Sequence, residues 1–363
     1  MVGTLDLACE VTDIIGGVDT HADTHTVAAL DGLGRLLGHA TFPATPAGFG
    51  ELLRWLRSHG NVVTVGVEGT GSYGAGLFQH LRAGGLRIVE VDQVDRGARR
   101  KTGKSDPTDA IAAARAVQAG TATGTPKTRD GVVESIRALR VARNGAIKSH
   151  TAAINALRQT VITAPAHLRS RLAGLGAKGL VDTCARLRPG DIHDPEQAVK
   201  ATLRRLARRC QMLTEELAET DKDLQTLISQ KAPVLLAVHG VGTDIAGQLL
   251  ITAGDNPERL KSEASFAALC GVSPLLASSG KTNRHRLNRG GNRGANSALH
   301  RVVIVRMKTH PETRAYVERR TKEGMSKREI IRCLKRYVVR ELLPLIKAPD
   351  QERPDLKLHS IAA

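Results

Sequence analysis

Residues 14–19 (IIGGVD) form an apolar run that ends on a carboxylate, and this run predicts the central strand of the first part of the chain. Residues 62–68 (VVTVGVE) repeat the pattern. Short apolar runs rich in β-branched residues predict buried strands, and open α/β sheets place polar functional groups at the carboxyl ends of such strands. We therefore expect Asp19 and Glu68 to lie at the same edge of one sheet.

The segments around these two runs alternate between the periodicities of strands and helices. The apolar patterns predict three meandering strands, then a helix, a strand, a helix and a strand, followed by a further helix. This is the order of a ribonuclease-H-like fold. The predicted strands are 14–19, 24–30, 36–42, 62–67 and 86–91, and the predicted helices are 46–59, 72–83 and 109–119.

Two further carboxylates, Asp106 and Asp109, are three residues apart in an SDPTD motif. Residues three apart share one face of a helix, so both could lie near Asp19 and Glu68. Alternatively, Ser105 or Asp106 caps the helix and the proline occupies its first turn; capping and metal binding are compatible. Clustered carboxylates repel when ionised and are stable mainly as ligands of hard cations, here Mg²⁺ or Mn²⁺. Paired cations commonly assist phosphodiester cleavage.

Composition favours a polyanionic partner. The 363 residues suffice for two or three domains and carry a net charge of +17, which predicts binding to DNA or RNA rather than to a membrane. Aromatic residues make up only 2%, so contacts must come mainly from Arg and Lys on phosphates. The five cysteines form no C-x-x-C pair, which argues against a zinc site and suits a reducing cytoplasm. No apolar run approaches transmembrane length.

Three segments are predicted to contact nucleic-acid phosphates. The first is a basic stretch directly before Asp106. The second is a Gly-x-Gly hairpin between two helices, whose backbone N–H groups could bind a phosphate as in a helix-hairpin-helix, although a plain tight turn also explains the glycines. The third is a flexible loop rich in Arg, Gly and Asn. The candidate residues are Arg96, Arg99, Arg100, Lys101, Lys104, Gly240, Gly242, Lys281, Arg284, Arg286, Arg289 and Arg293.

The middle of the chain is predicted to be helical over 132–161 and again after a Gly- and Pro-containing break at 174–190. The second helix carries a seam with alternating steps of three and four residues, which predicts a coiled coil with one polar position. The seam fits an intramolecular hairpin or a contact between chains. Its members are Leu203, Leu206, Cys210, Leu213, Leu217, Thr220, Leu224 and Leu227, and further helices are predicted at 294–309, 311–323 and 326–347.

Four ordered motifs resemble those of the IS110-type insertion-sequence transposases, which are DEDD transposases related to the Piv-type DNA invertases. The first three are GVDTHADTH at 17–25, VEGTGSYG at 67–74 and KSDPTDA at 104–110. The fourth combines GVSP, SG and GGN between 271 and 292. The resemblance covers roughly 14–165 and 233–320. Members often have Lys where this chain has Ala22, a difference that leaves the four acids intact.

The resemblance implies three domains: a RuvC-like nuclease domain at 1–130, a helical coiled-coil linker at 131–232 and a mostly helical transposase domain at 233–363. It implies that Asp19, Glu68, Asp106 and Asp109 bind divalent metal. Ser279 would attack DNA and form a phosphoserine intermediate, with the adjacent Ser278 as its rival. A structured bridge RNA would pair with donor and target DNA. The working protein would be a dimer or a dimer of dimers in the cytoplasm, at the nucleoid of a bacterium or archaeon.

The residues leave the mechanism open between alternatives. No Ser-His-Asp order surrounds Ser279, so a metal held by the acids is the expected activator, which requires the two domains to meet within one chain or across a dimer. A metal-dependent nuclease, junction resolvase or unguided invertase would need the acids without Ser279 or without RNA. A non-catalytic nucleic-acid-binding protein would tolerate Asp19→Asn. A zinc or iron site at His21 and His25 is not expected, because their spacing suits a helix and the segment reads as a strand.

Overall fold

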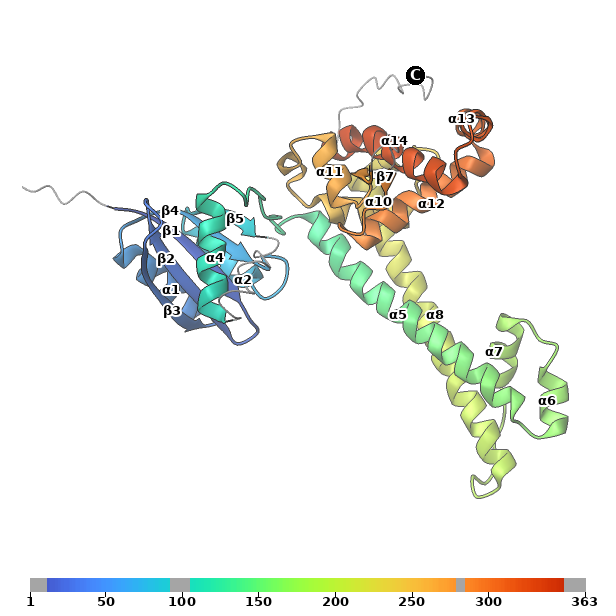
Figure 1. Ribbon diagram of the computed structural model, residues 1–363. Coiled ribbons are helices and arrows are strands. Elements are labelled where there is room, and N and C mark those ends of the chain that lie inside the picture. Colours follow the sequence, from blue (N-terminus) through green and yellow to red (C-terminus); the bar gives the residue numbers. More distant parts are fainter. Residues whose placement is uncertain (1–11, 92–104, 279–284, 349–363) are drawn as a thin grey trace, which may run out of the picture. The chain divides into compact units, whose positions relative to one another are not determined.

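The computed structural model describes residues 12–91, 105–278 and 285–348 and divides into two compact units, residues 1–128 and 129–363 (Figure 1). The first unit is a mixed α/β sheet with helices, and the second is almost entirely helical. This confirms the predicted combination of an α/β part with an all-α part. No helix among the residues described is both long and apolar enough to cross a membrane.

The first unit contains every strand that the sequence predicts for it. Its five-stranded sheet has the order β3-β2-β1-β4-β5, in which β1 pairs antiparallel with β2 and parallel with β4. The helices α1, α2 and α4 accompany the sheet. The strands are β1 (Asp13–Thr20), β2 (Thr24–Asp31), β3 (Leu36–Pro43), β4 (Asn61–Glu68) and β5 (Arg87–Val91), and the helices are α1 (Pro46–Ser58), α2 (Ala75–Ala83) and α4 (Asp106–Gln118).

The two faces of this sheet are covered by different helices. Strand side chains alternate between faces, so Gly16 and Gly17 point in opposite directions. A Cβ on Gly16 would meet Leu56 of α1, whereas a Cβ on Gly17 would meet Ala110 and Ala114 of α4. The main apolar core of the unit lies on the α1 and α2 side, where Phe49, Leu52, Leu56, Leu77 and Leu81 pack on the strands.

Two glycines let α4 lie directly against the central strands. A Cβ on Gly17 would be 2.2 Å from the carbonyl oxygen of Ala110, and a Cβ on Gly66 would be 2.6 Å from Val117. Both separations are shorter than any van der Waals contact. The close approach fixes α4 over β1 and β4, and this places the first turn of α4 at the carboxyl ends of those strands.

The second unit begins with two long helices, α5 (Val132–Ile162) and α8 (Pro195–Lys231), which lie side by side in Figure 1. The predicted seam of α8 is covered by α5 of the same chain, and Leu203, Cys210 and Leu224 on it are buried. The predicted break at 174–190 is wrong in part, because α7 (Ala177–Ala185) lies within it. Its buried Leu180 and Cys184 stabilise this short helix against α8.

The remaining helices form the end of the chain that the structure describes. The three predicted helices are confirmed as α12 (Arg293–Thr309), α13 (Pro311–Lys322) and α14 (Lys327–Lys347). Part of the loop predicted at 284–293 is instead a short strand, because β7 pairs with β6. The other elements are α6 (Ala166–Leu172), α9 (Pro233–Leu236), α10 (Thr243–Ala253), η1 (Pro257–Arg259), α11 (Glu263–Leu269), β6 (Leu275–Leu276) and β7 (His285–Arg286).

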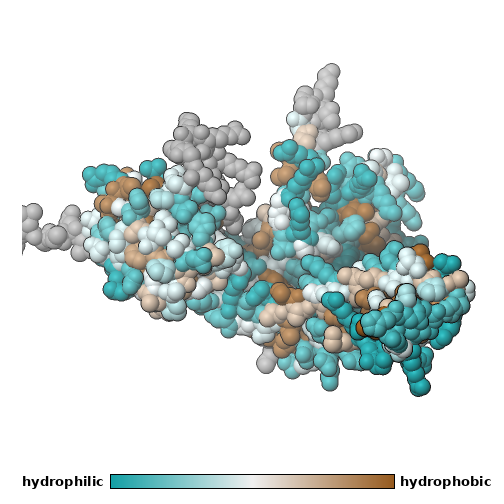
Figure 2. Space-filling view, turned by 90° about the horizontal axis from the view of Figure 1, so that it is seen from below, coloured by the Kyte–Doolittle hydropathy of each residue, from teal (hydrophilic) through white to brown (hydrophobic). Residues whose placement is uncertain are grey.

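A single large apolar core joins these helices, and it includes Ile136, Leu249, Phe266, Val302 and Leu342. On the face of the molecule seen in Figure 2, hydrophobic residues form scattered groups among hydrophilic ones. This surface is typical of a protein whose apolar side chains are mostly used in its cores.

Candidate metal centre

Asp19 and Glu68 stand at the carboxyl ends of neighbouring parallel strands, as the sequence predicts. The register pairs Gly17 with Gly66 and Val18 with Val67, so the next position on each strand carries the acid. Because side chains alternate, each acid shares a face with the glycine two residues before it. Both acids therefore lie on the face that α4 covers.

Helix α4 supplies the other two acids from its first turn. Asp106 is its first residue, with a side chain that is 50% exposed, whereas Asp109 is buried at 2% exposure. Ser105 is the N-cap residue and the proline lies in the first turn, as the cap interpretation predicts, although the Ser105 side chain makes no hydrogen bond to the backbone of that turn. The amino end of a helix favours negative charge, which suits two carboxylates there.

His21 joins the cluster directly after β1 ends. Its Nε2 atom lies 3.1 Å from Asp19 Oδ2 and 3.4 Å from Asp106 Oδ1. One potential ligand atom from each of Asp19, His21 and Asp106 lies within 4.8 Å of the other two. The sequence interpretation dismissed His21 as a ligand; the signal that could have found it is its position two residues after Asp19 in the first motif. His25, its supposed partner, is fully buried on β2 and stacks on Phe49.

The electrostatics of Asp19 show that these groups interact. Burial raises the pKa of Asp19, the nearby His21 lowers it, and the carboxylates of Asp109 and Asp106 raise it further, with a net increase above its ordinary value. A site that resists ionisation through burial and like charges is stabilised by a bound cation. Carboxylate oxygens suit hard divalent ions and an imidazole suits softer ones, so the residues fit a divalent metal ion without fixing which one.

Glu68 lies beside this group rather than within it. Its Oε2 atom is shielded from solvent. Its backbone carbonyl accepts a 2.8 Å hydrogen bond from the hydroxyl of Thr20, which ties the ends of β1 and β4 together. The chain then turns away at Gly69, whose φ of +69° favours glycine. The three-residue cluster of close ligand atoms does not include Glu68 among the residues described.

The predicted serine and much of the predicted nucleic-acid interface lie outside the described residues. These are Ser279, Lys281 and Arg284, together with the basic stretch of Arg96, Arg99, Arg100, Lys101 and Lys104. Ser278 is described and exposed, as are Arg286, Arg289 and Arg293. Gly240 has a φ of +86° in the turn between α9 and α10, and Gly242 is the N-cap of α10.

Two parts of the C-terminal motif pack against each other. A Cβ on Gly271 would lie 2.4 Å from the carbonyl oxygen of Gly290, so the GVSP and GGN segments are in backbone contact. The side-chain amide of Asn296 donates to the carbonyls of Cys270 and Gly271, at 3.1 and 2.9 Å. The buried Lys335 ammonium donates to Asn296 Oδ1 at 2.9 Å. The sequence interpretation missed both Asn296 and Lys335, which hold the segment before Ser279.

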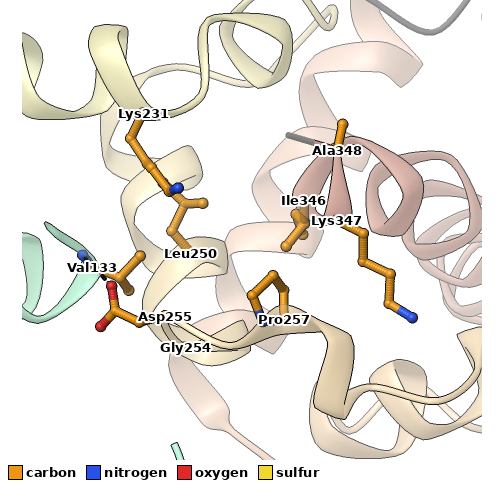
Figure 3. A pocket seen from close by; sticks show the side chains of 9 residues that line it. All are labelled: Val133, Lys231, Leu250, Gly254, Asp255, Pro257, Ile346, Lys347 and Ala348. Carbon is orange, nitrogen blue, oxygen red and sulfur yellow. Dashed lines mark hydrogen bonds between the residues drawn. The ribbon is translucent and has the colours of Figure 1, made fainter. Parts of the chain in front are cut away.

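A cavity of about 270 Å³ lies elsewhere, where α5 begins and α8 and α14 end (Figure 3). Asp255 borders it and accepts a 2.9 Å hydrogen bond from the Val133 backbone N–H. None of the predicted site residues lines it. The lining residues are Val133, Lys231, Leu250, Gly254, Asp255, Pro257, Ile346, Lys347 and Ala348.

Known families and proteins match the chain on both sides of its helical middle. A family model of DEDD-type IS110 proteins, described as "Transposase", matches residues 16–164. A second, described as "Transposase IS116/IS110/IS902 family", matches residues 232–318. These matches define the class as transposases of insertion sequences. The chain belongs to the IS110 family, which confirms the resemblance of its four motifs.

Two relatives illustrate the similarity. An uncharacterized 43.6 kDa protein of insertion element IS110 from Streptomyces coelicolor is 29% identical over 117 residues, which are 32% of this chain and 29% of that protein. An uncharacterized 42 kDa protein of insertion element IS900 from Mycobacterium paratuberculosis is 24% identical over 157 residues, 42% of this chain and 39% of that protein. The matched region thus spans about a third of the length of these relatives.

Proposed function

We propose that this chain is the transposase of an insertion sequence, an enzyme that cleaves and exchanges DNA strands with the help of a divalent metal. The convergence of Asp19, Asp106 and His21 at the edge of the sheet carries the proposal, together with membership of the IS110 family. The strand order β3-β2-β1-β4-β5, with α4 over the central strands, supports a ribonuclease-H-like, RuvC-like assignment for this unit.

The metal site would be held by Asp19, Glu68, Asp106 and Asp109. Bound there, Mg²⁺ or Mn²⁺ would supply polarisation of a phosphate oxygen and stabilise negative charge on the phosphate. Asp19 and Asp106 offer carboxylate oxygens within reach of one ion, and His21 orients both through its Nε2 atom. Buried Asp109 adds negative charge behind Asp19, which strengthens the attraction for a cation.

In the proposed chemistry, Ser279 is the nucleophile. Its Oγ atom would form a bond to a backbone phosphorus as one bridging P–O bond of the DNA breaks. The serine proton is lost, and the departing strand takes up a proton to leave as a hydroxyl. Attack by a hydroxyl of another strand would reverse the step and release the serine. The number of phosphoester bonds is conserved throughout, so the exchange needs no nucleotide cofactor.

The proposed partners are donor DNA, target DNA and a structured bridge RNA that pairs with both. A net charge of +17 supports polyanionic partners, and the exposed Arg286 and Arg289 lie shortly before α12, which begins at the exposed Arg293. A dimer or dimer of dimers would bring two DNA sites together. The guide RNA and the oligomer extend the proposal beyond the metal site. The role of the RNA is tested by omitting it from the reaction, and the oligomer is tested by measuring the molecular mass of the protein in solution.

The test mixes the purified full chain, Mg²⁺, RNA transcribed from the flanks of the element and end-labelled donor DNA, and then looks for a protein–DNA adduct that survives SDS. We expect an adduct in the wild type and in Ser278→Ala but none in Ser279→Ala. Asp19→Asn should abolish both the adduct and DNA cleavage. Asp23→Asn, the same substitution at an exposed nearby position, is the matched control and should retain both.

Two outcomes would contradict parts of the proposal. Free cleaved DNA without an adduct, unchanged in Ser279→Ala, would replace the serine step with metal-dependent hydrolysis by the acids. Full recombination by Asp19→Asn would reject the metal centre as the catalytic site. If the adduct forms equally well without RNA, the protein would be an invertase or transposase that needs no guide RNA.

A further inference from the structure

The far end of the α5–α8 pair is a small module with a core of its own. In Figure 1, α6 and α7 lie at the end of this pair that is remote from α10, α12 and α14. The core contains Leu157 of α5, Leu168 of α6, Leu180 of α7 and Leu203 of α8. We call the residues 145–213 the distal module. Most of the module's leucines are buried in this core, so the charged side chains of the module lie mainly on its surface.

That surface is strongly basic. The distal module contains twelve Lys and Arg residues against four Asp and Glu residues, a net charge of +8. In the residues that follow, the net charge is negative, because residues 214–223 contain five Asp and Glu residues and one Lys. Along α8 the positive charge therefore lies in the part of the helix that belongs to the distal module and does not continue evenly to its end.

Four arginines of α8 form the densest part of this charge: Arg204, Arg205, Arg208 and Arg209. At 100° per residue they occupy the side of α8 opposite the buried seam of Leu203, Ala207 and Cys210. Three of them are exposed and Arg204 is half-buried. None forms an ion pair with another described residue, whereas Lys200 and His167 both contact the carboxylate of Glu196. We call these four residues the α8 arginine face.

The α8 arginine face does not stabilise the isolated fold. Arg204 and Arg208, and Arg205 and Arg209, are like-charge pairs four residues apart, and such pairs destabilise a helix. Its members bring no compensating ion pairs. A bound anion on this surface would remove the repulsion and satisfy all four guanidinium groups.

The composition of the distal module narrows the kind of anion. It contains no Phe, Tyr or Trp, so it has no aromatic ring on which an unpaired base could stack. Planar guanidinium groups on adjacent turns, about 6 Å apart along the helix axis, suit a row of backbone phosphates. We propose that the distal module is a docking surface for the phosphate backbone of duplex DNA, formed by residues other than those of the metal centre. This proposal rests on the proposed function in one respect only, namely that the partner is a nucleic acid.

Binding is measured on the full chain without divalent metal, so that strand cleavage cannot interfere. Fluorescent duplexes of DNA and of RNA with the same sequence are titrated across a range of salt concentrations. The test variant replaces Arg204, Arg205, Arg208 and Arg209 with Gln, which has a helix propensity close to that of Arg. We expect weaker binding to a duplex and a slope of log K against log salt that is shallower by up to about 3.6, since each lost DNA phosphate contact removes about 0.9.

Two companion variants separate charge from structure. Lys at the same four positions keeps the charge and should retain most of the affinity. A matched control removes four exposed cations from α13 and α14 by the substitutions Arg314→Gln, Lys322→Gln, Lys327→Gln and Arg328→Gln, and should leave the slope nearly unchanged. Far-ultraviolet circular dichroism of all variants checks that the helices persist.

The loss of affinity in the Gln variant should appear with the DNA duplex, and a loss confined to the RNA duplex would overturn the inference. Unchanged affinity for both duplexes would overturn the inference, as would an equal loss in the α13–α14 control or a loss confined to single strands. Because this assay involves no cleavage, it can succeed when the adduct test fails. It can also fail when the adduct forms, so the two proposals stand or fall independently.

Discussion

His21 is the residue whose role the structure changes most. Its Nε2 atom lies near both Asp19 and Asp106, while its side chain is 46% exposed. We expect His21→Ala to reduce adduct formation by about 10–100-fold, the usual effect of losing a residue that orients metal ligands. Thermal unfolding should barely change, because little apolar area is lost. His39→Ala, at an exposed position on β3, is the control and should leave activity intact.

Asp19 should make the metal-free protein sensitive to pH. Because burial and the neighbouring acids raise its pKa, the folded chain holds the proton more tightly than the unfolded chain does. The contribution of Asp19 to the free energy of unfolding therefore falls as pH rises from its ordinary pKa of 3.8 through the folded value. We expect Asp19→Asn to unfold at a higher temperature than wild type in EDTA at neutral pH.

In the presence of Mg²⁺, the wild type should unfold at a higher temperature than Asp19→Asn. A ligand at one hundred times its Kd stabilises the folded state by about 2.7 kcal/mol if the unfolded chain does not bind it. The wild type should gain this stability and Asp19→Asn should gain much less. Calorimetry with and without Mg²⁺ measures both effects, and an equal gain in the two proteins would rule out Asp19 as a ligand.

Among the elements, α4 depends on the absence of a side chain at Gly17. Gly17→Ala would place a Cβ 2.2 Å from the Ala110 carbonyl, so α4 must move away from β1. We expect a loss of about 1–3 kcal/mol in the free energy of unfolding, as for other overpacked cores, and weaker Mg²⁺ binding as Asp106 and Asp109 shift. Urea unfolding and calorimetric titration measure the two. Gly32→Ala, where nothing lies within 4 Å, should affect neither.

A buried ion pair joins α5 to α10. Arg140 is 6% exposed and donates to the Asp244 side chain and backbone carbonyl, and Arg301 of α12 pairs with the same carboxylate at 2.6 Å. Burial acts to raise the pKa of Asp244, but the two arginines together hold it below its ordinary 3.8. This contribution to stability is therefore present above pH 3.8 and is lost as pH falls through the lower folded value.

Removal of the buried Arg140 leaves the half-buried Asp244 carboxylate with reduced compensation, so Arg140→Ala should lower the free energy of unfolding by about 3 kcal/mol. The loss should be largest at neutral pH and should shrink as falling pH protonates Asp244. Denaturation curves at pH 7 and pH 3 test this. A cost that stays the same at both values would show that packing of the Arg140 stem, rather than its charge, joins these helices.

For the whole molecule, the two compact units should respond differently to metal. The single Trp of the chain, Trp55, lies in α1 of the first unit, whereas most helical residues belong to the second. Fluorescence therefore reports the first unit, and circular dichroism at 222 nm reports mainly the second. We expect Mg²⁺ to move the urea midpoint of the fluorescence transition and not that of the circular dichroism transition. Identical shifts would mean that the units unfold together.

The sequence predicts regular elements well and long-range neighbours poorly. The strands ending at Asp19 and Glu68 and the helices after Arg293 are confirmed, because their apolar periodicity is strong. Helix α7 was missed because a nine-residue helix with two buried side chains carries little periodic signal. The predicted domain boundaries at 130 and 232 stay predictions; the compact units place the long helices with the C-terminal helices.

The candidate site could likewise be predicted from the sequence only in part. Two strand ends and an i, i+3 pair suffice to predict a carboxylate cluster. The contribution of His21 depends on the chain direction after β1 ends, which local pattern does not specify. The Lys335–Asn296 hydrogen bond joins residues on different helices, and no motif in either helix predicts it. Ser279 remains a prediction from the resemblance.

The length of α8 has a consequence for any nucleic acid held at both of its ends. Its 37 residues rise about 1.5 Å each, so the helix is about 55 Å long. Duplex DNA rises about 3.4 Å per base pair, so this length matches about 16 base pairs, or roughly one and a half turns. A straight helix alongside a straight duplex would then meet opposite grooves at its two ends, and a nuclease footprint would contain two protected stretches with that spacing.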